Sequence, residues 1–238
     1  MDFSSRSALY ETIADKIERL ILTEEMQTDS KMPSEQYLAD SFGVSRPVIR
    51  EALKLLRERG LIASRQGAAT VITEPCTEVL ARNLNRIILM KNVTPMQVYQ
   101  IRMVLEMMSI RQATEKFTEK DIEELCELNS DMIMSKGNRP LRAELDMAFH
   151  KRIADIAENP LLSMMLEAVS TLMHPLIMSN LEKLGDADKG VESHKRIIEA
   201  IKSGDGEYAS SLMKEHLTSS AQYYGNFADS IFAIPDEQ

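Results

Sequence analysis

The chain has 238 residues and a net charge of −9, and this length suits two modest domains of roughly 100–200 residues each. Its two cysteines, Cys76 and Cys126, are too few for a disulfide framework or a cysteine zinc site. The sequence shows no signal-peptide pattern and no apolar run near the ~20 residues of a membrane span, so we expect a cytoplasmic protein without a membrane partner.

The N-terminal residues first predict two helices. Apolar residues recur with a period close to 3.6 over Leu9–Leu22, which indicates one amphipathic helix. Ser34 is a good N-cap for a short second helix. The residues expected to face inward from that helix are Tyr37, Leu38 and Phe42. Gly43 supplies the turn that follows.

A third helix is expected to begin after Ser45, which can cap it, and to stop at Gly60. Its inward positions are Val48, Ile49, Ala52, Leu53, Leu55 and Leu56. Residues 61–63 and 70–72 are short strand-like runs that predict a β-hairpin around residues 66–69. Three helices followed by a hairpin make a winged helix-turn-helix.

The third helix opens with two arginines one turn apart, Arg46 and Arg50, as a recognition helix needs to reach base edges in the major groove. Residues 41–65 hold six basic and two acidic residues, although residues 1–75 carry −2 and residues 76–238 carry −7. The positive charge is therefore local to the recognition helix, as phosphate contact requires. The alternative is that these arginines only form a solvated charged surface.

Residues 32–72 resemble the GntR family of bacterial transcription regulators. The family's signature is matched at Pro33-Ser34-Glu35, Leu38-Ala39, Phe42 to Arg46, Arg50 to Leu53 and Gly60-Leu61. The departures are Met32 for Leu, Ile49 for Val, Asp29 for a usual Gly and Ala69 for the second glycine of the wing. The last departure affects the wing tip, because glycine permits a positive φ that alanine resists.

The resemblance implies contacts with double-stranded DNA at five positions. These are Gln36 at the start of the second helix, Arg46 and Arg50 in the recognition helix, and Gln66 and Gly67 at a wing tip that enters the minor groove. An arginine at the first turn of a recognition helix can pair bidentately with guanine, which gives ~1–3 kcal/mol of discrimination. Ser45 and Lys54 are expected to hold phosphates instead.

Residues 76–238 predict an all-α domain, with a boundary near residues 73–78 where Thr73-Glu74-Pro75 breaks the pattern. No strand alternation appears, and turn or capping residues separate the helical stretches. The expected helices are Val79–Met90, Thr94 to about Phe117, one from Thr118 to before Gly137, Leu141–Ala157, Asn159 to about Leu184, Val191–Lys202 and Tyr208–Asn226. The fold class is therefore mainly α, with an N-terminal winged helix-turn-helix and a C-terminal antiparallel bundle of about seven helices.

Three histidines lie on the apolar faces of expected helices. Asp146 and His150 are four residues apart and share a face, while His194 and His216 lie on apolar stripes of two later helices. Three imidazoles and one carboxylate directed at one interior suit a divalent transition metal. The alternative is that these histidines are hydrogen-bonded core residues.

This half resembles the FCD domain, the ligand-binding domain of the FadR branch of GntR regulators. The marks are Arg102-x-x-Leu105-Glu106 and Asp146-x-x-x-His150, with two further histidines on later helices. In metal-binding members four such side chains hold the ion. The resemblance therefore implies that Asp146, His150, His194 and His216 bind a divalent ion: zinc first, with nickel, manganese, cobalt or iron as other choices.

Arg102 lies among apolar neighbours on the first long helix of this half. One interpretation is that it clamps the carboxylate of a small effector that also fills open positions on the metal. A single aspartate neutralises only part of the charge of a divalent ion, which favours an anionic effector. The other interpretation is an ion pair with Glu106, one turn later. His174 is expected to line this pocket or to cap the packing.

These features together predict a homodimeric repressor of a catabolic operon, which binds a palindromic operator and responds to a small organic acid. Three alternatives stay open. Three histidines and an aspartate around a metal can activate water in an enzyme, although no convincing general base lies nearby. The ion itself can be the signal in a metal sensor. The metal can also be purely structural.

Overall fold

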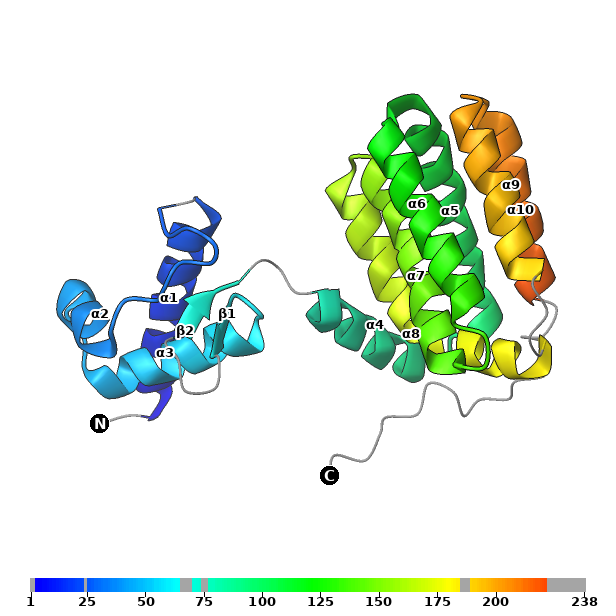
Figure 1. The fold of residues 1–238 in the computed structure, drawn as a ribbon. Helices are drawn as coiled ribbons and strands as arrows, with labels where there is room; N and C mark the ends of the chain where they lie inside the picture. The colour runs from blue at the N-terminus through cyan, green and yellow to red at the C-terminus, as the bar shows by residue number, and fades with distance from the viewer. Residues whose placement is uncertain (1–2, 24, 65–69, 74–76, 185–188, 222–238) are drawn as a thin grey trace. The chain divides into compact units, whose positions relative to one another are not determined.

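The computed structural model describes residues 3–23, 25–64, 70–73, 77–184 and 189–221. Within these residues the chain forms ten helices and one two-stranded sheet (Figure 1). The chain divides into two compact units, Met1–Val79 and Leu80–Gln238. None of the described helices is long and apolar enough to cross a membrane. The mainly α fold with a small hairpin is as the sequence predicts.

The N-terminal unit is a winged helix-turn-helix, which confirms the prediction for this part of the chain. Its elements are α1 (Phe3–Leu22), α2 (Glu35–Phe42), α3 (Arg46–Glu58), β1 (Ile62–Ser64) and β2 (Thr70–Ile72). The strands pair antiparallel, with Ile62 opposite Ile72. Both α1 and α2 pack on α3, and α1 begins six residues before the predicted Leu9.

Capping and a glycine turn fix the angle between α2 and α3. The Ser34 hydroxyl accepts a hydrogen bond from the backbone N–H of Tyr37 at 3.2 Å, which caps α2. Gly43 ends the helix with a φ of 65°, a left-handed conformation that glycine adopts without strain. The prediction that Tyr37 faces inward is wrong, because its side chain is 63% exposed. The buried residues of this short helix are Leu38 and Ala39, and Tyr37 is rotated about 100° from Leu38.

The C-terminal unit contains the predicted seven helices within the part of the chain that the structure describes. They are α4 (Thr77–Lys91), α5 (Pro95–Lys116), α6 (Glu119–Met134), α7 (Arg139–Ile156), α8 (Pro160–Leu184), α9 (Lys189–Lys202) and α10 (Gly206–Ala221). Reciprocal capping boxes open two of them, between Thr94 and Gln97 on α5 and between Thr118 and Asp121 on α6. The predicted end of the last helix lies outside the described residues.

The helix α5 is central to the bundle, because it packs against α7, α8, α9 and α10, while α6 packs against α7 and α9 (Figure 1). The large side chains at the centre of this core are almost completely buried. They include Ile110, Leu125, Phe149, Ile153 and Met173. This packing directs the inner faces of α7, α9 and α10, which carry the histidines, toward one interior.

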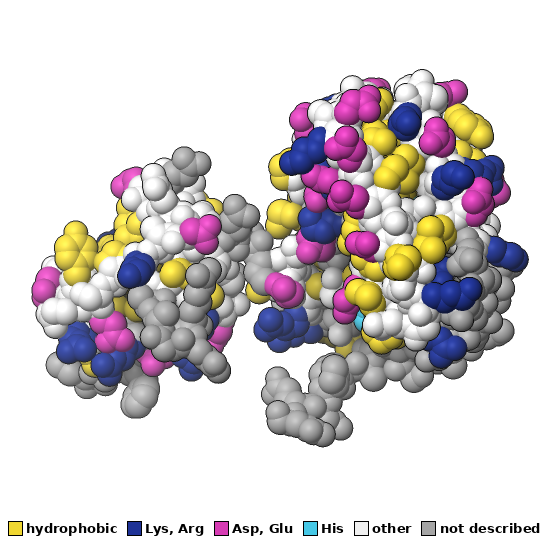
Figure 2. Space-filling model, in the orientation of Figure 1, with side chains coloured by type: hydrophobic (Ala, Val, Ile, Leu, Met, Phe, Trp, Pro, Cys, Tyr) yellow, Lys and Arg dark blue, Asp and Glu magenta, His cyan; other side chains and the backbone are white. Residues whose placement is uncertain are grey.

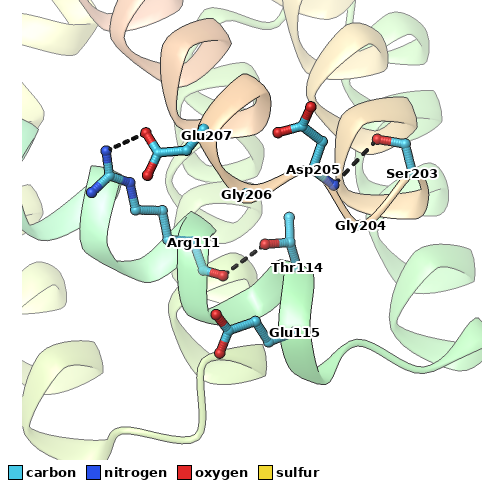
Figure 3. A pocket seen from close by; sticks show the side chains of 8 residues that line it. All are labelled: Arg111, Thr114, Glu115, Ser203, Gly204, Asp205, Gly206 and Glu207. Atoms are coloured by element: carbon cyan, nitrogen blue, oxygen red, sulfur yellow. Dashed lines mark hydrogen bonds and ion pairs between the residues drawn. The ribbon is translucent and has the colours of Figure 1, made fainter.

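Helix α10 begins in close contact with α5, beside an open hollow (Figure 3). A Cβ atom at Gly206 would lie 2.8 Å from the Oγ1 atom of Thr114, so the bare glycine allows this approach. The Thr114 hydroxyl donates a hydrogen bond to the carbonyl of Arg111 at 2.7 Å. The Arg111 side chain pairs with Glu207 at 2.8 Å and joins the two helices. These contacts join α5 to the first turn of α10.

Candidate metal centre and DNA-contacting surface

One face of α3 carries the basic side chains that the sequence assigns to DNA. Arg46, Arg50 and Lys54 are each four residues apart, and all three are exposed. The opposite face is buried in the core of the N-terminal unit by Val48, Ile49, Ala52, Leu53 and Leu56. Burial of that face fixes the orientation of the helix, so the basic residues form one exposed row.

The other predicted DNA contacts have mixed outcomes. Ser45 is the N-cap residue of α3 and is exposed, but its side chain makes no capping hydrogen bond. Gln36 is exposed on α2, where its amide donates a hydrogen bond to Asp40 at 2.9 Å. Gln66 and Gly67, the predicted wing tip, lie outside the described residues.

Both recognition arginines contact one carboxylate that sequence reasoning missed. The Oε2 atom of Glu35 lies 2.8 Å from the Nε atom of Arg50 and 3.5 Å from the Nη2 atom of Arg46. The hydrogen bond from Arg50 lowers the pKa of Glu35, so this carboxylate is ionised at neutral pH. Glu35 and Arg50 are fifteen residues apart, and no helical spacing connects them in the sequence.

The C-terminal unit brings together the four side chains predicted as metal ligands. Asp146 and His150 come from α7, His194 from α9 and His216 from α10. One ligand-type atom of each residue lies within 4.8 Å of those of the other three. The three histidines are buried and Asp146 is 15% exposed, and the face shown in Figure 2 reveals almost no histidine surface.

The separations between these atoms fit a bound divalent ion. The Nε2 atoms of His150 and His216 are 3.3 Å apart. A tetrahedral zinc ion with bonds of about 2.0–2.1 Å holds its ligand atoms about 3.3 Å apart. The oxygens of Asp146 lie 4.0 Å from His150 and 3.6 Å from His194. Among the described residues, neither ring nitrogen of His194 has a hydrogen-bond partner, as expected of a side chain that needs a ligand.

A buried carboxylate orients His150. Glu106 on α5 contacts the Nδ1 atom of His150 through one oxygen, and its other oxygen accepts a hydrogen bond from the Nε atom of Arg102 at 2.6 Å. A carboxylate at Nδ1 favours a proton there, which leaves the lone pair of Nε2 directed at the cluster. This is the outer-shell arrangement that supports histidine ligands in metalloproteins.

The protonation states also suit metal binding. Burial lowers the pKa of His216 to about 4. Burial and the neighbouring His216 hold the pKa of His194 well below its usual range. Both imidazoles are therefore neutral at neutral pH, which is the form that binds metals. Although burial alone would raise it, the contacts with His150 and Arg102 lower the pKa of Glu106 to about 2.

Two buried arginines lie close to the cluster. Arg102 is 3% exposed and makes the ion pair with Glu106 that was its alternative interpretation. Arg142, 4% exposed, was not predicted; it precedes Asp146 by one turn of α7, and its charge contributes to the low pKa of His194. The four-residue spacing on α7 was the signal that could have identified it. His174 is half-buried on α8 and does not belong to the ligand group.

Comparisons with known proteins cover both units. Residues 9–72 match the family model described as bacterial regulatory proteins, gntR family, and residues 97–219 match the FCD domain. The HTH-type transcriptional regulator LutR of Bacillus subtilis (strain 168) is 32% identical over 204 residues, 84% of this chain and 93% of the relative. The HTH-type transcriptional repressor NanR of Enterobacter sp. (strain 638) is 25% identical over 224 residues, 90% of this chain and 85% of the relative.

A solved structure agrees with these matches. Streptococcus agalactiae GntR superposes with a TM-score of 0.68 at 25% identity, covering 90% of this chain and 100% of that one. The similarity therefore extends over both units of the chain.

Proposed function

The chain belongs to the GntR family of bacterial regulatory proteins and carries an FCD domain, and from this premise we propose a homodimeric repressor controlled by a small organic acid at a metal site. The protein is a DNA-binding transcription regulator rather than an enzyme. In this proposal residues 1–75 bind the operator DNA in the cytoplasm. Residues 76–238 bind the effector and form the dimer.

The observation that carries the proposal is the convergence of Asp146 and three histidines from three helices on one interior. A divalent ion held there would offer its open coordination positions to the oxygens of a carboxylate. Zinc suits the three imidazoles and one carboxylate, and nickel, manganese, cobalt or iron suit them as well. Asp146 neutralises only part of the charge of such an ion, which favours an anionic ligand.

Arg102 would provide the protein's own contact to the effector. Its guanidinium has five N–H donors, and the Nε donor makes the hydrogen bond with Glu106 at 2.6 Å. A planar carboxylate matches the geometry of the donors on the terminal nitrogens. The same Glu106 contacts His150, so the effector clamp and a metal ligand share one carboxylate.

Dimerisation follows from the way winged helices read DNA. A dimer places two recognition helices one helical turn of DNA apart, about 34–36 Å, on the half-sites of a palindrome. The repressor NanR is a relative along most of the chain, which supports repression as the mode of control. Many small organic acids serve as carbon sources, so an effector of this class would fit a catabolic operon as the target. The acid must bind the DNA-competent and DNA-incompetent states with different affinities to exert control.

A thermal-shift screen against organic acids tests this proposal. We expect a hydroxy acid, sugar acid or dicarboxylate to raise the melting temperature of the zinc-loaded protein and not of the EDTA-stripped protein, because ligands that bind only the folded state stabilise it. If zinc alone shifts melting and also controls DNA binding, the metal-sensor alternative replaces the acid sensor. If chelation destabilises the fold and leaves an acid response intact, the metal is structural.

The substitution Arg46→Ala tests base recognition by α3. We expect it to weaken binding to a DNA duplex selected by the wild-type protein from a random library by about 10-fold to 100-fold, since a bidentate arginine–guanine contact gives about 1–3 kcal/mol. Binding to a scrambled duplex of the same composition should change much less. Lys54→Ala is the control, because loss of a phosphate contact weakens both duplexes alike. Equal losses with Arg46→Ala would mean that Arg46 contacts only phosphate.

A further inference from the structure

Glu35 lies between the two arginines that are expected to read bases. One oxygen of its carboxylate is 2.8 Å from the Nε atom of Arg50 and 3.5 Å from the Nη2 atom of Arg46. Both arginines are more than half exposed, while the Glu35 side chain is 34% exposed. A single acidic oxygen on α2 thus limits the positions of two long side chains on α3.

The backbone around Glu35 is well fixed. Glu35 is the first residue of α2, directly after the capping residue Ser34. The helix is anchored by Leu38 and Ala39, which belong to the same buried core as Ile49 of α3. The carboxylate therefore has a defined place relative to α3, and it can act as a fixed point for flexible arginine side chains.

A carboxylate at this position adds only modestly to the stability of the fold, since its place in the first turn of α2 contributes about 0.3–1 kcal/mol. Exposed ion pairs contribute about 0–1 kcal/mol to folding. DNA affinity alone does not account for the carboxylate, because a negative charge beside the recognition helix repels phosphates. The charge lowers the attraction to any DNA, whereas the contacts restrict the two arginines. Restriction of the arginines before binding reduces the conformational entropy that they lose on a base.

The short contact leaves the base-reading donors of Arg50 available, whereas the longer 3.5 Å contact with Arg46 is through its terminal nitrogen Nη2. Glu35 contacts Arg50 through Nε, and an end-on bidentate contact with guanine uses the two terminal nitrogens. We propose that Glu35 is a positioning residue that sets the base selectivity of Arg46 and Arg50 and lowers binding to nonspecific DNA. This inference rests on the proposed role of the two arginines in reading bases.

The test is a comparison of Glu35→Gln with wild type on two DNA duplexes, one selected by the wild-type protein from a random library and one a scrambled duplex of the same composition. We expect affinity for the selected duplex to fall about 10-fold, which is part of the loss expected when a whole bidentate arginine–guanine contact is removed. Affinity for the scrambled duplex should rise, because a negative charge beside the recognition helix is removed. A repeated selection with the variant should give a relaxed consensus at the bases that the arginines read.

Glu58→Gln is the matched control. It removes the same charge from the exposed end of α3, about 18 Å along the helix from Arg46, whereas the carboxylate that pairs with Arg46 and Arg50 is that of Glu35. We expect this variant to change both affinities by the same factor. The melting temperatures of both variants should remain close to that of wild type, which excludes misfolding as the cause.

A double-mutant cycle tests whether Glu35 acts through the arginines. In an Arg50→Ala background, Glu35→Gln should change selectivity several-fold less than in wild type, because the restrained side chain is gone. The selectivity ratio is the affinity for the selected duplex divided by the affinity for the scrambled duplex. The inference is overturned if Glu35→Gln leaves this ratio unchanged, or changes it only as much as Glu58→Gln does. If Arg46→Ala and Arg50→Ala also leave the ratio unchanged, it is the proposed base reading that fails; if they lower it, only the role of Glu35 fails.

Discussion

The substitution His194→Ala is expected to lower zinc affinity more than 100-fold, a larger loss than the about 10–100-fold that follows removal of an outer-shell partner. His194 contributes one of four converging ligand-type atoms, and its ring is completely buried against Phe149, with centroids 3.9 Å apart. Zinc at about 100 times its dissociation constant should stabilise the wild-type protein by about 2.7 kcal/mol. For a unit of this size that corresponds to a rise in melting temperature of about 5–10 °C, which the variant should lose.

The prediction is checked by measuring the zinc stoichiometry and affinity of each variant, and the melting temperatures of its metal-stripped and zinc-loaded forms. His194→Leu is a second variant, because leucine fills the space beside Phe149 without offering a nitrogen. His174→Ala is the matched control, since His174 lies on α8 outside the ligand group. Zinc binding by both His194 variants with wild-type affinity would contradict the assignment of the metal centre, whatever their stability.

The sequence predicts the fold well where the signals are local. Thr94 and Thr118 form the capping boxes that their spacing suggests, and Gly43 adopts the left-handed turn between α2 and α3. The predicted start of α1 is too late, because residues 3–8 lack the apolar period that marks the rest of the helix. The sequence predicts the wrong orientation for Tyr37, because an eight-residue helix has too few turns to define its buried face.

The candidate site was predictable only in part, because only some of its contacts follow from local sequence spacing. Asp146 and His150 share a face at a spacing of four residues, so their proximity follows from the helix alone. The contact between Glu106 and His150 joins residues forty-four apart, and that between Glu35 and Arg50 joins residues fifteen apart. Such contacts depend on how helices pack, and no short-range pattern encodes them.

The substitution Glu106→Gln should both destabilise the C-terminal unit and weaken its hold on metal. The Glu106 side chain is 1% exposed and contacts Arg102 and His150 at once. Removal of its charge leaves the guanidinium of Arg102 buried without this partner charge, and loss of one member of a buried ion pair typically costs about 3–5 kcal/mol. The neutral amide also orients His150 less firmly, so zinc affinity should fall about 10–100-fold. Chemical unfolding of the stripped protein and zinc titration measure the two effects separately.

Glu207→Gln is the control for this substitution. Glu207 on α10 pairs with Arg111 on α5, the helix that also carries Glu106, but its side chain is 79% exposed. Exposed pairs contribute at most about 1 kcal/mol, and this one is remote from the metal ligands, so zinc affinity should not change. A Glu106→Gln variant with lower stability and wild-type zinc affinity would show that Glu106 supports the fold without orienting His150.

The response to acids gives Glu106→Gln a third readout. Glu106 lies between Arg102, the proposed carboxylate clamp, and His150, a proposed metal ligand. If the effector binds through both, the thermal shift given by the acid should shrink in this variant even when zinc is saturating. If the acid raises the melting temperature of the zinc-saturated variant as much as that of wild type, effector binding does not depend on the Arg102–Glu106 pair. The clamp would then have to be sought elsewhere near the ion, with buried Arg142 on α7 as the next side chain to replace.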